Sequence, residues 1–126
     1  MTTAIERVNA FYRVTLEEKN ADKLRDYFAD DFVFVGPLAE CKGAEAAVEL
    51  NRGFLPAMIG YRMHQQFERG NEVCSIYELE LHAPAGGVLA VTMADWIKLQ
   101  GDRLLEQRVY YDAREFERQM AMAAAA

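Results

Sequence analysis

Residues 88–112 decide the fold: they read VLAVTMADWIKL, then QGDR, then LLEQRVYYD. Apolar and polar residues alternate with a period of two in the first and third segments, which is the pattern of a half-buried strand. Gly101 and Asp102 form a turn dipeptide between them. The stretch therefore predicts an antiparallel hairpin with its turn at Gly101.

One residue of this hairpin is acidic although the strand face on which it lies is otherwise apolar. Asp95 alternates in phase with Met93, and a turn centred on Gly101 places it opposite Gln107. Burial among apolar side chains disfavours the ionised form of a carboxyl group and so raises its pKa. Asp95 is therefore the first candidate for an acid or base in a pocket. The alternative is a buried acid that only fixes the strand register by hydrogen bonds to Gln107 or Tyr12.

The rest of the chain predicts helices followed by a meander of strands. Helices are expected over 3–19, 21–28 and from 44 to about 53, and strands over 32–35, 61–68, 72–82 and in the 88–112 hairpin. Residues 113–120 form either a short helix or a mobile tail. This order predicts an α+β fold in which a curved antiparallel sheet wraps around helices as a cone. We expect a single domain over 1–126, with frayed ends at about 1–2 and 121–126.

The convex face of the sheet is expected to be apolar. In the predicted phase it carries Ile76, Trp96, Leu104 and Tyr110, whereas Leu105, Gln107, Val109 and Tyr111 face inward. Large apolar residues on an otherwise exposed sheet face favour a covering partner, most simply a second copy in a two-fold dimer. We therefore predict a homodimer through the convex face.

Composition excludes several classes of partner. The net charge is −6 and no block of Lys or Arg occurs, so nucleic acid and anionic membranes are poor partners. Cys41 and Cys74 lack metal-ligand spacing, and a reducing cytoplasm suits them. No signal peptide, membrane-spanning run, phosphate loop or GxSxG motif is present. We expect a cytoplasmic protein without a metal or a cofactor.

Three segments resemble the nuclear transport factor 2-like superfamily, in particular its SnoaL-like branch. They are FYRVTLEEKNADKLRDYFADDFVFVGP at 11–37, KGAEAAVE at 42–49 and ADWIKLQGDRLLEQRVYYD at 94–112. The superfamily includes ketosteroid isomerase, polyketide cyclases, limonene epoxide hydrolase and scytalone dehydratase, so the resemblance implies a fold with a pocket rather than one reaction.

The comparison with ketosteroid isomerase also assigns roles to residues. The resemblance places Tyr12 and Asp95 where that enzyme has the tyrosine and protonated aspartic acid of its oxyanion hole. The isomerase has its general-base aspartate immediately before a proline, but this chain has Gly36 before Pro37. Steroid isomerisation therefore lacks its proton-transfer group here.

The sequence thus predicts a pocket and leaves two kinds of function open. Its expected lining is Tyr12, Met63, Tyr77, Met93, Asp95, Gln107 and Tyr111. The first hypothesis is cofactor-free acid–base chemistry on a small hydrophobic carbonyl or polyketide-like compound: Asp95 is the acid or base, Tyr12 holds the oxyanion and Gln107 orients Asp95. The second is a binding or accessory module that holds a small apolar ligand or partner without turnover.

Two further titratable residues stay outside this site. His64 shares the outer alternation with Arg62 and Gln66, and turns inward only if a bulge shifts the phase. Asp112 ends a strand, where a place at the rim of the pocket or a helix-capping role is as reasonable as catalysis.

Overall fold

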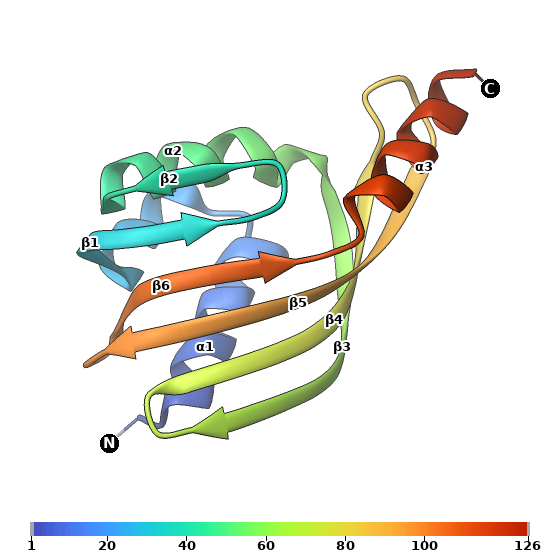
Figure 1. The fold of residues 1–126 in the computed structure, drawn as a ribbon. Coiled ribbons are helices and arrows are strands. Elements are labelled where there is room, and N and C mark those ends of the chain that lie inside the picture. The colour runs from blue at the N-terminus through green and yellow to red at the C-terminus, as the bar shows by residue number, and fades with distance from the viewer. Residues whose placement is uncertain (1, 126) are drawn as a thin grey trace.

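Six strands form one curved, open sheet that is concave toward the helices (Figure 1). The computed structural model describes residues 2–125. The strands lie in the order β2-β1-β6-β5-β4-β3 and run antiparallel, apart from the parallel pair β1 and β6. Their bounds are β1 (Phe28–Val35), β2 (Glu40–Lys42), β3 (Met58–Arg69), β4 (Glu72–His82), β5 (Val88–Gln100) and β6 (Arg103–Tyr110). The predicted α+β class and curved sheet are confirmed, whereas the short strand β2 was not foreseen.

The helices lie on the concave side and at one end of the sheet. They are α1 (Ala4–Tyr12), the π-helical η1 (Arg13–Glu17), the 3₁₀ helices η2 (Ala21–Tyr27) and η3 (Leu55–Ala57), α2 (Ala44–Phe54) and α3 (Ala113–Ala125). The single helix expected over 3–19 is thus an α-helix that widens into a π turn. The segment expected to be a helix or a tail is helical, and it continues to Ala125. Residues 1 and 126, at the ends expected to fray, lie outside the described residues.

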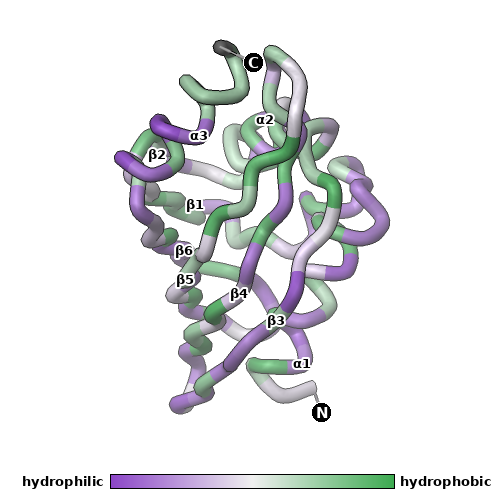
Figure 2. The backbone as a smooth tube through the Cα atoms, turned by 90° about the vertical axis from the view of Figure 1, so that its right-hand side faces the viewer, coloured by the Kyte–Doolittle hydropathy of each residue, from purple (hydrophilic) through white to green (hydrophobic). Residues whose placement is uncertain are grey.

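The core fills the space between the concave face of the sheet and α1. Hydrophobic and hydrophilic residues interleave along the strands (Figure 2), and β5 alternates strictly between residues turned inward and outward. The largest fully buried apolar side chains are Tyr12, Phe28, Phe32, Leu24, Leu79, Ile97, Leu99 and Leu104. Burying such side chains is the main favourable term in folding, and it holds α1 against the sheet.

A bulge in β6 changes the predicted phase of the hairpin. Lys98 pairs with Glu106 but Leu99 pairs with Leu104, so Leu105 is an extra residue on β6. Leu104 is therefore 0% exposed and belongs to the core, and its assignment to the convex face was wrong.

The turn and the bulge together change the partner of Asp95: the turn pairs Gln100 with Arg103, one residue later than predicted, and the bulge adds one more residue. Asp95 pairs with Val109, and Gln107 pairs with Ile97, so the predicted direct pairing of Asp95 with Gln107 is also wrong. The two side chains still share the inner face as diagonal neighbours, which are close enough for long side chains to meet.

A second bulge lies in β3 at His64. Met63 pairs with Tyr77 and Gln65 pairs with Ile76, so His64 is the extra residue and its side chain is exposed. Gln66 consequently turns inward, against its predicted orientation. Its Nε2 donates to Asn9 Oδ1 at 2.8 Å and to Ser75 Oγ at 3.0 Å.

The convex face carries exposed aromatic residues from three strands. Phe67 on β3, Trp96 on β5 and Tyr110 on β6 are 55%, 39% and 52% exposed. Among the helices between residues 2 and 125, none combines the length and hydropathy that a bilayer span requires.

Candidate functional site

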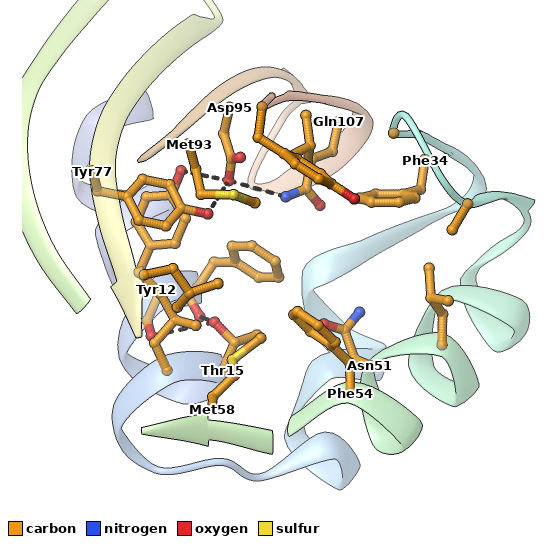
Figure 3. Close-up of a pocket in the computed structure, with 18 residues that line it drawn as sticks. Tyr12, Thr15, Phe34, Asn51, Phe54, Met58, Tyr77, Met93, Asp95 and Gln107 are labelled. Atoms are coloured by element: carbon orange, nitrogen blue, oxygen red, sulfur yellow. Dashed lines mark hydrogen bonds between the residues drawn. The ribbon is translucent and has the colours of Figure 1, made fainter. Parts of the chain in front are cut away.

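A cavity of about 170 Å³ lies between the concave sheet face, the α1–η1 segment and α2 (Figure 3). Its polar lining is Tyr12, Thr15, Asn51, Tyr77, Asp95, Gln107 and Tyr111. The remaining lining is Phe11, Leu16, Phe34, Gly36, Ala39, Leu50, Phe54, Met58, Leu79, Met93 and Val109. An apolar hollow with a few convergent polar groups is the usual form of a small-molecule site.

Asp95 is the centre of the polar lining, and its two carboxylate oxygens have different surroundings. Tyr12 Oη donates to Asp95 Oδ2 at 3.0 Å, Tyr77 Oη at 3.1 Å and Gln107 Nε2 at 3.2 Å. Asp95 Oδ1 is buried and accepts no hydrogen bond from any residue within 2–125. A buried acceptor without a partner is costly, and this oxygen is the carboxylate atom of the cluster that still lacks a donor.

Local backbone structure explains why the first helix contributes so many lining residues. The π turn of η1 follows directly after Tyr12, and Glu18 N donates to Arg13 O at 2.8 Å across it. The wider turn places Thr15 and Leu16 on the same cavity wall as Tyr12. Thr15 itself does not offer its hydroxyl to the cavity, because Oγ1 donates to Phe11 O at 2.9 Å.

Opposing effects determine the protonation of this cluster. Burial raises the pKa of Asp95 to about 6, while the hydrogen bonds from Tyr12, Tyr77 and Gln107 act to lower it. Burial, together with the charge of Asp95, raises the pKa of both tyrosines well above the usual value. At neutral pH Asp95 is therefore ionised and both tyrosines are protonated donors. A desolvated carboxylate with one free oxygen is suited to accept a proton.

The structure brings most of the predicted site residues together. Tyr77, Met93, Gln107 and Tyr111 line the same cavity as Asp95 and Tyr12. The hydroxyl of Tyr12 donates to Asp95, however, and is not directed at an open position where an oxyanion would lie.

Met63, His64 and Asp112 lie away from the cavity. Met63 faces the inner side of β3 but lines a separate surface hollow beside Tyr61, so its predicted place in the pocket was wrong. His64 is exposed. Asp112 Oδ1 accepts from Glu115 N at 3.0 Å, which caps the start of α3.

Sequence reasoning missed the residues that α2 contributes, above all Asn51. The inward stripe of α2 begins with Ala44, Ala47 and Val48, and the next residue on it is Asn51. An amide on an otherwise apolar helical stripe is a readable signal, because buried amides need hydrogen-bond partners.

The charge state of the cluster leads to a first prediction. Tyr77→Phe removes one donor from the ionised carboxylate, so the pKa of Asp95 should rise above its value of about 6. A hydrogen bond to a charged group contributes ~1.5 kcal/mol or more, which corresponds to a rise of about one pH unit. Carbon-13 NMR of the labelled aspartate carboxyls measures the midpoint. Tyr111→Phe is the control, because Tyr111 lines the cavity without a bond to Asp95; an unchanged midpoint in Tyr77→Phe would contradict the described donor.

The fold and the pocket together define the class of protein. A curved antiparallel sheet with helices inside its concave face and a pocket between them is the architecture of nuclear transport factor 2-like domains. Comparison with known proteins agrees. The family model described as a SnoaL-like domain matches residues 8–107, and the chain belongs to this family. No curated protein matches the chain.

Several solved structures share the fold at low sequence identity. One is an epoxide hydrolase from M. tuberculosis that is similar to limonene epoxide hydrolase (TM-score 0.79, 17% identity, 98% of this chain and 92% of that chain). A second, from Shewanella putrefaciens, is named as a candidate SnoaL-like polyketide cyclase (TM-score 0.78, 17% identity, 97% and 88%). A third, of unknown function, is a nuclear transport factor 2-like protein from Cytophaga hutchinsonii (TM-score 0.78, 22% identity, 93% and 96%). These likenesses establish the fold and leave the reaction open.

Proposed function

We propose that this protein binds a small, largely apolar compound and transfers a proton from it with Asp95 as the base and without a cofactor. The observation that carries the proposal is the carboxylate of Asp95: it is fully buried in the lining of an apolar cavity, and one of its oxygens has no partner within residues 2–125. A structural acid would be expected to have both oxygens satisfied.

The proton-transfer step uses the two oxygens of Asp95 differently. Oδ1 takes a proton from an acidic C–H or O–H bond of the compound, and the electrons of that bond stay on the compound. Oδ2 remains held by Tyr12, Tyr77 and Gln107. Those three donors fix the direction of the carboxylate, so they are positioning residues. Because Asp95 itself serves as the base, this step does not need the aspartate that ketosteroid isomerase has at the position of Gly36.

A probe reaction tests the base without knowledge of the natural substrate. Cleavage of 5-nitrobenzisoxazole needs only a base: the C–H proton leaves to the carboxylate, a nitrile forms, the N–O bond breaks and a coloured phenolate is released. We expect saturable cleavage by the protein whose rate rises with pH through a midpoint near 6, the pKa of Asp95. Cleavage no faster than in buffer, or without that midpoint, would contradict the proposal.

A binding module without turnover is the second candidate, and one observation favours it. Asp95 has no exposed surface, and both Tyr12 and Tyr77 already have a protein acceptor for their hydroxyl hydrogens. Native mass spectrometry of freshly purified protein separates the two functions. A co-purifying apolar compound, together with no cleavage of 5-nitrobenzisoxazole beyond that in buffer, would support the binding module.

We further propose that the convex sheet face forms a homodimer. Its exposed aromatic residues Phe67, Trp96 and Tyr110 come from strands that span most of the sheet. A second copy would cover this surface symmetrically.

Trp96→Glu is expected to convert this dimer to a monomer, because an unpaired charge is costly at the centre of an apolar interface. Light scattering coupled to size exclusion measures the mass of the species. Val88→Glu is the control, since Val88 is 60% exposed at the far end of the same strand. A monomeric wild-type protein would overturn the proposal.

A further inference from the structure

We infer that the pocket has a second anchoring residue, Asn51, and that it selects a compact single-ring compound with a hydrogen-bond donor at one end and an acceptor at the other. The inference rests on the proposed role of Asp95 at the same site. It adds a residue on α2 and a chemical class of ligand.

Asn51 has hydrogen-bonding capacity to spare. Its Nδ2 donates to Ala47 O at 2.8 Å, one turn earlier in α2. This is the only hydrogen bond that its side chain makes within residues 2–125, although an amide nitrogen carries two hydrogens. The bond to Ala47 also holds the amide in place, and Figure 3 shows Asn51 across the cavity from Asp95 and Gln107. One N–H of Asn51, like its amide oxygen, is therefore free for a ligand.

The two ends of the cavity differ in exposure. Asp95, Tyr77 and Met93 are buried at one end, whereas Asn51 is half-buried and its neighbour Phe54 is 40% exposed at the other. A ligand consequently enters past Phe54 and reaches Asp95 last.

The ends also differ in polarity. The deep end holds an acceptor without a hydrogen-bond partner, Asp95 Oδ1, and the outer end presents the side-chain amide of Asn51, whose second N–H has no partner within residues 2–125. A donor or acidic hydrogen on the leading end of a ligand complements Asp95, and an acceptor on the trailing end, such as a carbonyl, pairs with the free N–H of Asn51. A ligand with acceptors at both ends would place an oxygen against the carboxylate and be rejected.

Size and shape restrict the ligand further. A cavity of about 170 Å³ is close to the ~150 Å³ hollow that accommodates a benzene molecule in an engineered protein core. Aromatic rings line it from several directions, including Phe11, Phe34 and Phe54. One planar ring with substituents at opposite ends matches this space and these walls.

Two phenols of similar shape test the inference by calorimetric titration. In 4-hydroxyacetophenone the ring carries a hydroxyl at one end and a carbonyl at the other, and 4-isopropylphenol lacks the carbonyl. We expect the wild-type protein to bind the ketone about tenfold more tightly, the effect of one net hydrogen bond. Asn51→Leu should abolish this preference by weakening the ketone alone. Asn51→Asp, which keeps the shape but replaces the donor by an acceptor, should reverse it. Asp95→Asn should weaken both phenols and keep the preference.

The outcomes separate the two proposals. Equal affinity of the wild-type protein for the two phenols, no binding of either one, or an undiminished preference in folded Asn51→Leu and Asn51→Asp would overturn the role of Asn51. If the preference depends on Asn51 but 5-nitrobenzisoxazole is not cleaved, the role of Asn51 is supported and the role of Asp95 as a base is contradicted. If 5-nitrobenzisoxazole is cleaved but the Asn51 variants keep the wild-type preference between the phenols, the role of Asp95 as a base is supported and the role of Asn51 is contradicted.

Discussion

Asp95→Asn is expected to lower the cleavage of 5-nitrobenzisoxazole at pH 7.5 by about 100-fold or more, within the range that a positioned general base contributes. An amide oxygen can still accept hydrogen bonds from Tyr12, Tyr77 and Gln107, so the geometry of the cluster is retained. The amide group cannot accept the proton, because its nitrogen is not basic. The initial rate of phenolate release, measured by absorbance, gives the ratio of kcat/KM between the two proteins.

A matched carboxylate outside the cavity controls for general effects of losing a charge. Asp112 is exposed and caps α3, so Asp112→Asn should cleave the probe at the wild-type rate. A reduction of only a few-fold in Asp95→Asn would mean that another group, or the cavity alone, accelerates the probe reaction. In that event Asp95 would be a structural acid and the binding module would be the better description.

The sequence located Asp95 correctly because β5 is regular. Every inward position of that strand alternates with an outward one from Val88 to Gln100, so the period-two pattern alone shows which way Asp95 faces. The same reasoning predicted that Met93 lies beside it. Where a strand keeps its period, the hydrophobic pattern determines the face of each residue.

The errors in strand phase arose where that period is interrupted. The extra residues Leu105 and His64 turn Leu104 and Gln66 inward, and nothing in the composition of either strand marks them as bulges. Bulges depend on how neighbouring strands bend together, which is tertiary information.

The sequence also did not predict where along the inner face of the sheet a residue lies. Met63 has the expected orientation, yet the curvature of the sheet carries it beyond the cavity to the hollow beside Tyr61. The sequence pattern predicts which face a residue occupies and does not predict how far a curved sheet displaces it. The contribution of α2 depended likewise on how that helix closes the cavity, although the helical stripe that ends in Asn51 was readable.

The pH dependence of stability provides a test that needs no ligand. Burial raises the pKa of Asp95 from 3.8 to about 6, so the folded protein binds a proton between these values that the unfolded chain has released. The contribution of Asp95 to stability is therefore complete below pH 3.8 and is lost as the pH rises through 6. Each unit of difference corresponds to 1.36 kcal/mol, so we expect a loss of about 3 kcal/mol.

Comparison with Asp95→Asn isolates this effect from the other carboxylates. Glu115 and Glu106, whose pKa values are lowered by arginine neighbours, impose an opposite dependence on pH, but they do so equally in both proteins. The unfolding free energy of the wild type minus that of Asp95→Asn should fall by about 3 kcal/mol between pH 3.5 and 7.5. Urea titrations followed by the fluorescence of Trp96 measure it. A difference that does not change with pH would show that the Asp95 carboxyl has the same pKa in the folded and unfolded chain. Such a carboxyl would be ionised throughout the range in which a poised base should titrate, and the pH midpoint assigned to catalysis would then belong to another group.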